Sequence, residues 1–362
     1  ATSVGAGTTT FVAFGIGSDG TVFQATITNT AASAVDLTLA ATSEYDSLAL
    51  SGGINLSAVV ADISEKTITG AGTVTLSDAI ADIDTTDVSA SSFVFETTAG
   101  AAAAMTVASG QALVLETALG GDITIQTAAA ADGTADSVNL TLQAATGANE
   151  LLVNTADQEI ETFTVVVDPA AGFDDTAAFV IHNITSGDAV ELLSSDADVE
   201  VTIQELDATT FDGSDVAGEL SVTQDTAAAL SIVGAAGATT AVFTGTTQEN
   251  VFESTNSADD DVTFVTTTGG ATAVFAGGDN AVAADALTTG TLAVVGGAGD
   301  DVVNMDALTT GTVTLNLGDG DNTVRLGDGD ALAAATIVIT TGTGDNSLHI
   351  EDATLAATTT FT

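Results

Sequence analysis

Short runs of alternating apolar and polar residues dominate the C-terminal half of the chain. Val313 and Leu315 fall on one side of an extended backbone, whereas Thr314 falls on the other. A period of two is typical of a strand with one buried face and is not expected of a helix. Runs of this kind recur about every ten residues between residues 220 and 325, so the pattern predicts a long series of short strands.

The same region contains an internal repeat. The segment "DALTTGTLAVVGGAGDD" (285–301) aligns without a gap with "DALTTGTVTLNLGDGDN" (306–322), at a period of 21 residues. A further copy, "DALAAATIVITTGTGDN" (330–346), starts three residues late, and a degenerate copy precedes them at 272–280. Each repeat contains two strand-like runs and two turns, as expected for one coil of a repetitive fold.

These patterns predict an all-β protein with a parallel β-solenoid, of the β-roll or β-helix kind, in its C-terminal half. In such a fold Val294, Leu315 and Ile339 would stack inside, because residues one repeat apart lie on neighbouring coils. An antiparallel sandwich also has strands at spacings of 8–12 residues. The near-identity of the copies at one period, without Asn-Gly hairpin signals, favours the solenoid.

The pattern weakens toward the N-terminus. We assign residues 1–95 to a β-rich region that is a candidate assembly segment. Residues 96–160 form a transitional β region and a candidate early part of the solenoid, and residues 161–362 form the solenoid itself. The motif-bearing repeats occupy residues 275–349.

The charge of the chain is unusually one-sided. Fifty acidic side chains face only two basic ones, Lys66 and Arg325, which gives a formal net charge of −48. Such a chain cannot neutralise a phosphate backbone, so a nucleic-acid partner is excluded. No apolar run approaches the ~18 residues that a membrane span needs. The chain begins at Ala1 without a Met or a basic segment, which fits either a processed exported protein or simply an arbitrary boundary of this sequence.

A solenoid would stack many of these acids. Side chains one repeat apart would lie ~4.8 Å apart on adjacent coils. Two carboxylates at that separation repel by about 1 kcal/mol in water, and by more where water is excluded. A bound cation would relieve this repulsion. The repeat predicts one column of acids at Asp279, Asp300, Asp321 and Asp345, and another at Asp285, Asp306 and Asp330.

One turn carries a recognisable motif. The segment "GGAGDDVVN" (296–304) fits the pattern Gly-Gly-x-Gly-x-Asp-x-hydrophobic-x, with weaker copies at 276–282, 317–325 and 341–349. The chain thereby resembles the haemolysin-type (RTX) calcium-binding repeat proteins, and its composition is similar to that of acidic bacterial surface-layer proteins. The resemblance implies Ca²⁺ in the turns between coils of a parallel β-roll. The ligands it implies are Asp279, Asn280, Gly297, Gly299, Asp300, Asp301, Asp319, Asp321, Asn322, Asp345 and Asn346.

Three of the four copies have Asn where that family has Asp, at 280, 322 and 346. Elsewhere, we expect the acidic run 259–261 to be a solvated turn. His182 and His349 are far apart in the sequence and there is no cysteine, so a zinc site is not expected.

Catalysis is not expected either. A polysaccharide lyase needs cations to stabilise developing negative charge, and this chain has almost none. A glycosidase needs two carboxylates, but the chain has no Trp and a single Tyr for stacking a sugar.

We therefore expect an extracellular, cell-surface structural protein that assembles with itself into a layer or filament, stabilised by calcium. The alternative is a calcium-binding adhesin or a spacer module of a larger secreted protein, with a cell-surface glycan as a partner. The apolar segments 7–17 and 352–362 are candidate edges for pairing between subunits.

Overall fold

A computed structural model describes most of the chain. The described residues are 9–14, 24–29, 34–39, 47–64, 66–79, 81–96, 102–127, 136–146, 148–153, 160–171, 178–185, 189–224, 228–244, 247–287, 290–308, 311–327, 335–351 and 358–362.

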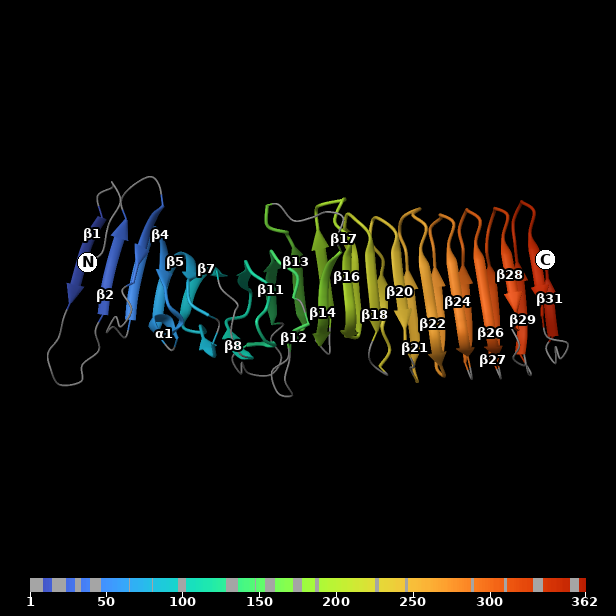
Figure 1. The fold of residues 1–362 in the computed structure, drawn as a ribbon, viewed down its shortest axis with the longest axis horizontal. Coiled ribbons are helices and arrows are strands. Elements are labelled where there is room, and N and C mark those ends of the chain that lie inside the picture. Colours follow the sequence, from blue (N-terminus) through green and yellow to red (C-terminus); the bar gives the residue numbers. More distant parts are fainter. Residues whose placement is uncertain are drawn as a thin grey trace. The chain divides into compact units, whose positions relative to one another are not determined.

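The chain divides into two compact units, residues 1–173 and 174–362. From β5 (Thr67–Leu76) onward successive strands alternate between two sheets, so that each strand pairs in parallel with the next but one. The fold is an all-β parallel solenoid of about 12 turns that spans residues 27–361. Figure 1 shows the regular succession of coils in the C-terminal unit, from β14 in green to β31 in red.

The N-terminal unit contains thirteen of the described strands and a short helix, α1 (Val60–Ile63). Only β1 and β2 pair antiparallel among the described strands of this unit. The first sheet comprises β1 (Thr9–Phe14), β2 (Gln24–Asn29), β3 (Val35–Thr38), β4 (Ser47–Ala58), β5 (Thr67–Leu76), β7 (Val88–Phe95), β9 (Gln111–Leu115), β11 (Ser137–Leu142) and β13 (Thr162–Val167). The second comprises β6 (Ile83–Asp84), β8 (Ala103–Val107), β10 (Ile123–Thr127) and β12 (Glu150–Val153).

The C-terminal unit is the more regular one, and all of its described pairings are parallel. Its first sheet comprises β15 (Ala189–Ser194), β17 (Thr210–Val216), β19 (Ser231–Val233), β21 (Glu249–Glu253), β23 (Gly270–Val274), β25 (Thr291–Val295), β27 (Gly311–Asn316), β29 (Ala335–Thr340) and β31 (Thr358–Phe361). Its second comprises β14 (Phe179–Thr185), β16 (Val201–Asp207), β18 (Leu220–Gln224), β20 (Thr239–Phe243), β22 (Asp261–Thr267), β24 (Ala281–Leu287), β26 (Val302–Leu308), β28 (Thr323–Leu326) and β30 (Ser347–Ile350).

The core lies between the two sheets and consists of columns of stacked apolar side chains. Val294 pairs in register with Leu315, and Leu315 with Ile339, and all three are buried, as predicted. Aromatic residues extend the same stacking, since the rings of Phe243 and Phe264 on adjacent coils lie 5.0 Å apart. Burying a side chain of this size contributes roughly 1.5–3 kcal/mol, so each added coil extends the core.

The predicted solenoid is confirmed, but its restriction to the C-terminal half is wrong. In the N-terminal unit Leu48 pairs in parallel with Ile68, and Ile68 pairs with Val88. The coils there vary in length, and β4 meets β5 with register shifts. Without a fixed period, comparison of the sequence with itself could not detect these coils.

Candidate cation site in the turns of the C-terminal unit

The motif-bearing turns connect the two sheets along one edge of the C-terminal unit. In the turn between β25 and β26, Gly297 and Gly299 have positive φ angles of 89° and 144°. A Cβ atom on Gly299 would lie 2.0 Å from the carbonyl oxygen of Gly278 on the preceding coil. Glycine is therefore required here both by its backbone conformation and by the close stacking of the turns.

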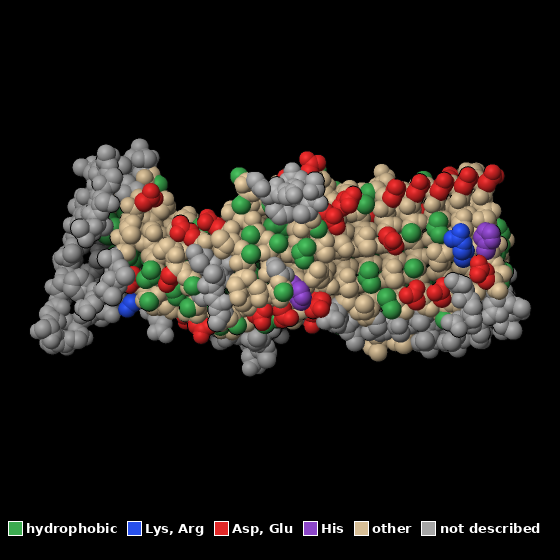
Figure 2. All heavy atoms as spheres, viewed as in Figure 1, with side chains coloured by type: hydrophobic (Ala, Val, Ile, Leu, Met, Phe, Trp, Pro, Cys, Tyr) green, Lys and Arg blue, Asp and Glu red, His purple; other side chains and the backbone are tan. Residues whose placement is uncertain are grey.

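Exposed aspartates form a column along these turns, here called the outer column. Each carboxylate except that of Asp345, the last member, accepts a hydrogen bond from the backbone N–H of the aspartate on the following coil, at 2.7–2.8 Å. Figure 2 shows this region as a row of acidic side chains along one edge. The members of the outer column are Asp259, Asp279, Asp300, Asp321 and Asp345.

The outer column contains the four acids that the repeat predicts, and the predicted stacking is confirmed. It also contains Asp259, which the sequence placed in a solvated acidic turn. Four of the five carboxylates have a backbone donor, so hydrogen bonding offsets part of the repulsion between neighbours. A bound ion is not needed to explain the position of any single member.

The next residue in each turn points inward and forms a second column, here called the inner column. Each side-chain Oδ1 accepts a hydrogen bond from the backbone of the preceding coil, at 2.8–3.1 Å. All but Asn346 are buried, with exposed fractions of 1–2%. The members are Asp260, Asn280, Asp301, Asn322 and Asn346.

The asparagines of the inner column satisfy the turn carbonyls with their own amide groups. Nδ2 of Asn280 donates to the carbonyl oxygen of Gly278 (2.9 Å) and to Oδ1 of Asp301 (2.9 Å). Nδ2 of Asn322 donates to the carbonyl oxygen of Gly320 (3.2 Å) in the same way. At these coils, the glycine carbonyls that a calcium ion would use are already hydrogen-bonded.

Asp301 occupies the same position but cannot donate as a carboxylate. Its Oδ1 accepts bonds from the backbone N–H (3.1 Å) and Nδ2 (2.9 Å) of Asn280. Its Oδ2 is buried and has no hydrogen-bond partner among the described residues. Oδ2 lies beside Gly296, where a Cβ atom would approach it to 2.0 Å. In the neighbouring coils the asparagine Nδ2 donates to turn carbonyls, and the carbonyls at the corresponding sequence positions here belong to Gly297 and Gly299. A carboxylate cannot donate to a carbonyl, so a cation or a proton would offset the cost of burying Oδ2.

Burial raises the pKa of Asp301 above its ordinary value, although hydrogen bonds from Asn280 act in the opposite direction. The charges of Asp279 and Asp300 raise this pKa further. The second acid of the inner column, Asp260, also has a raised pKa because of its burial, opposed by hydrogen bonding to Ser254 and Thr239. The expectation that residues 259–261 form a solvated turn is wrong for Asp260, which is 2% exposed because the neighbouring coil covers it. Its 20-residue offset from Asn280 marks it as the next member of the column.

The remaining predicted residues lie elsewhere. Asp319 is exposed, and its carboxylate accepts hydrogen bonds from the backbone N–H (2.6 Å) and hydroxyl (2.8 Å) of Thr343, which lower its pKa. It belongs to neither column. Asp285 and Asp306 lie next to each other on β24 and β26, as predicted, whereas Asp330 lies outside the described residues.

No protein-family model matches the chain, and no curated protein or solved structure is detectably similar to it. The resemblance to calcium-binding repeats therefore rests on the turn motif, and the parallel solenoid is the part of it that the structure bears out. Among the described residues, no helix is both long enough and apolar enough to cross a membrane.

Proposed function

We propose that this protein is a structural component of the extracellular space, with turns stabilised by calcium, which assembles with itself into a layer or filament. The observation that carries the proposal is the Asp301 carboxylate, buried with Oδ2 unpaired in a turn rich in glycine carbonyls. Every coil adds a stacked acid to the outer column, and a divalent ion held inside the turn would offset that charge.

Calcium suits this site better than other common cations. It accepts six to eight oxygen ligands in irregular geometry, including backbone carbonyls, whereas magnesium requires near-ideal octahedral geometry and retains its water. Asp301 would supply the charged ligand, and Gly297 and Gly299 would supply neutral carbonyl oxygens. Coils with asparagine in the inner column carry no buried charge for a cation to neutralise. We therefore expect few calcium sites, with the site at Asp301 as the strongest.

The expected affinity points to a location outside the cell. A site with a single buried carboxylate falls at the weak end of the range set by ligand charge, where extracellular modules bind calcium with Kd values of roughly 10⁻⁴–10⁻³ M. Such a site fills only where calcium is abundant. The absence of cysteine and the large negative charge are compatible with a surface location.

Self-assembly is supported by an exposed sheet edge. Strand β31 pairs on one side with β29 and has no second strand partner among the described residues. Phe361 on β31 and Ile350 on β30 are each 45% exposed. An apolar strand edge of this kind can accept a strand from another molecule through main-chain hydrogen bonds.

At the N-terminal side the predicted edge is partly paired. Strand β1 pairs antiparallel with β2 of its own chain, over Thr9–Phe14. The rest of the predicted segment 7–17 and most of 352–362 lie outside the described residues. The self-assembly part of the proposal therefore rests on the exposed edge formed by β31.

The first test is thermal unfolding in EGTA, CaCl₂, MgCl₂ and NaCl at matched ionic strength, for the wild type, Asp301→Asn and Asp300→Asn. Both variants remove one charge, but only Asp301→Asn supplies an amide to the inner column. Calcium at a hundredfold excess over Kd should stabilise the wild type by about 2.7 kcal/mol, or roughly 5–10 °C in Tm. Asp300→Asn should keep this response and Asp301→Asn should lose it. Equal melting in EGTA and CaCl₂ would rule out the calcium site.

The second test is electron microscopy of the wild type in calcium and in EGTA, with Phe361→Asp and Val295→Asp. Val295 is also an exposed apolar residue, at 38%, but it lies on a sheet face. We expect ordered assemblies in calcium that Phe361→Asp prevents and Val295→Asp leaves intact. Calcium-dependent stability with monomers under all conditions would instead favour the adhesin or spacer role.

A further inference from the structure

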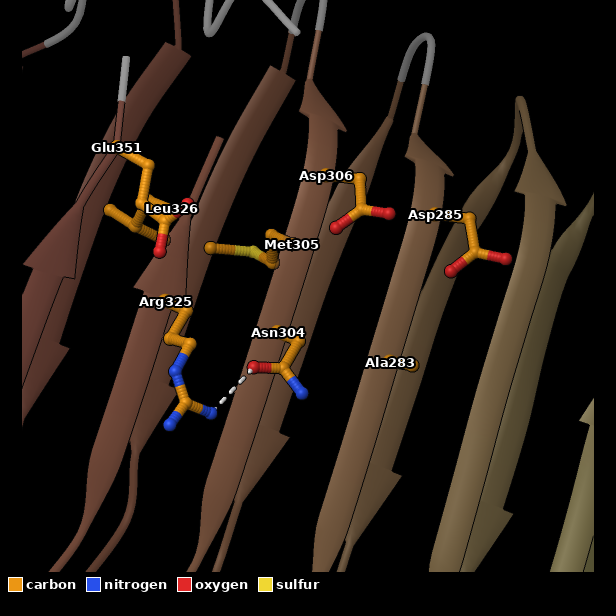
Figure 3. Close-up of a pocket in the computed structure, with 8 residues that line it drawn as sticks. All are labelled: Ala283, Asp285, Asn304, Met305, Asp306, Arg325, Leu326 and Glu351. Atoms are coloured by element: carbon orange, nitrogen blue, oxygen red, sulfur yellow. Dashed lines mark hydrogen bonds between the residues drawn. The ribbon is translucent and has the colours of Figure 1, made fainter. Parts of the chain in front are cut away.

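A second site lies on the outer face of the C-terminal unit, away from the turn columns. A pocket of about 330 Å³ opens over β24, β26 and β28, and Glu351 lines it just beyond the end of β30. Figure 3 shows Arg325 and Asn304 toward one end and the carboxylates of Asp306 and Asp285 toward the other. The volume is at the lower end of the range of about 300–1,000 Å³ for small-molecule sites.

The pocket follows from the register of the coils. Asn304, Arg325 and His349 pair in sequence across β26, β28 and β30, which places their side chains in one outward row. In the neighbouring row, the position after Leu326 is Gly327, between Asp306 on one coil and Glu351 on the next. Glycine has no side chain, so the row is interrupted there. The gap separates two carboxylate-bearing residues that stand two coils, or about 10 Å, apart.

Arg325 is the only arginine of the chain and is exposed. Within the described part of the chain, its guanidinium makes one long hydrogen bond, 3.4 Å from Nη1 to Oδ1 of Asn304, and no ion pair. Guanidinium groups bind planar carboxylates through two parallel hydrogen bonds. In a chain with fifty acids, this lone guanidinium retains most of its donors for a ligand.

The opposite wall offers acceptors. The carboxylates of Asp285, Asp306 and Glu351 can each accept hydrogen bonds from ligand hydroxyl groups. They do not approach closely enough to form a group that could share one metal ion. The buried residues Met305 and Leu326 line the pocket between the two walls and provide an apolar contact that aromatic residues often provide for sugars.

We propose that this pocket binds an acidic sugar unit of a polysaccharide, with the sugar carboxylate on Arg325 and its hydroxyl groups on Asp306 and Glu351. A simple anion would meet the acidic wall without donating to it, and a neutral sugar would leave the guanidinium unpaired. The charge of the chain repels anions at long range, but at physiological salt this field is screened over about 8 Å. Recognition thus requires both the carboxylate and the hydroxyl groups of the ligand.

This site is independent of calcium in the turns and would add a glycan-binding activity to the structural role. The probe is sodium glucuronate, followed by ligand-observed NMR titration in EGTA, with glucose and acetate as matched ligands. Glucose lacks the carboxylate and acetate lacks the hydroxyl groups. We expect saturable binding of glucuronate, and binding of glucose and acetate at least about tenfold weaker.

The variants are Arg325→Gln, Arg325→Lys and Glu351→Gln, with Glu253→Gln on the exposed surface of β21 as the control. Arg325→Gln should weaken glucuronate binding at least tenfold, and Arg325→Lys should weaken it less because the charge remains. Glu351→Gln should weaken it severalfold, and the control should not change it. Equal binding of glucuronate and acetate, or unchanged binding by Arg325→Gln with a native melting curve, would overturn the proposal.

Discussion

The two units of the chain reach the same fold with different degrees of regularity. In the C-terminal unit Ala273, Val294 and Leu315 pair in succession at steps of 21 residues. In the N-terminal unit the step grows to 27 residues between Leu113 and Leu140. Alternation of apolar and polar residues is therefore enough to build parallel coils, because variable turns can absorb differences in coil length.

The difference appears in the turns. Coils of similar length, with steps of 20, 21, 21 and 24 residues between members, place the equivalent turn residue on top of itself in successive coils, which produces the outer and inner columns of the C-terminal unit. In the N-terminal unit polar turn residues also form local contacts, such as the bond from the Thr86 N–H to Asp84 Oδ1 at 3.0 Å. Columns of like side chains, and with them a candidate cation site, require that the same turn recur in successive coils as well as a solenoid.

The largest expected effect tests the close stacking of the regular turns. Gly299→Ala would place a Cβ atom 2.0 Å from the Gly278 carbonyl oxygen, at a positive φ. Gly110→Ala in the N-terminal unit has a similarly unfavourable φ of 77° but open space around it. We expect Gly299→Ala to destabilise the protein by more than about 3 kcal/mol, and Gly110→Ala by about 1 kcal/mol, in urea denaturation. Equal losses would show that the turns are not tightly stacked.

The second largest effect is expected from replacing an asparagine of the inner column by aspartate. Asn322→Asp removes the amide donor to Gly320 and buries a third carboxylate in the inner column, next to Asp301. In EGTA we expect a loss of roughly 2–4 kcal/mol. Calcium should restore most of it and raise the calcium stoichiometry by one in equilibrium dialysis. Asn139→Asp, on an exposed position of β11, is the control and should change neither quantity.

A smaller effect concerns pH. Because burial raises the pKa of Asp301, the folded protein binds this proton more tightly than the unfolded chain does. The resulting stabilisation is fully present below the ordinary carboxyl pKa of about 4 and is lost as pH rises through the folded value. In EGTA, the stability of the wild type relative to Asp301→Asn should therefore fall as the pH rises above about 4. A difference that stays constant as the pH rises would show that Asp301 does not titrate as inferred.

The smallest effect concerns the outer column. Asp321→Asn keeps a side-chain oxygen that can accept the Asp345 N–H and removes one charge between two others. At low ionic strength this should stabilise the protein by less than about 1 kcal/mol. At 1 M salt, where the screening length is about 3 Å, the gain should disappear from the melting curve. A gain that persists at high salt would mean that charge repulsion is not its cause.

Much of the fold followed from local patterns. The alternation around Val313 and Leu315 identified the strands, and the fixed offset between two copies identified their stacking. Four of the five acids of the outer column followed from the repeat, since equivalent residues of successive copies lie on adjacent coils. The N-terminal coils did not follow, because their lengths vary and self-comparison depends on a constant period.

The sequence by itself determined that this chain forms coils and that its acids stack. Only the tertiary structure decided that Asp300 points to solvent while Asp301 is buried, because the neighbouring coil determines which of two adjacent side chains is covered. It also decided that asparagine amides occupy the glycine carbonyls at most coils and that Gly327 interrupts an outward row beside Arg325. Donors, acceptors and empty space are properties of the stack, so no single repeat contains them.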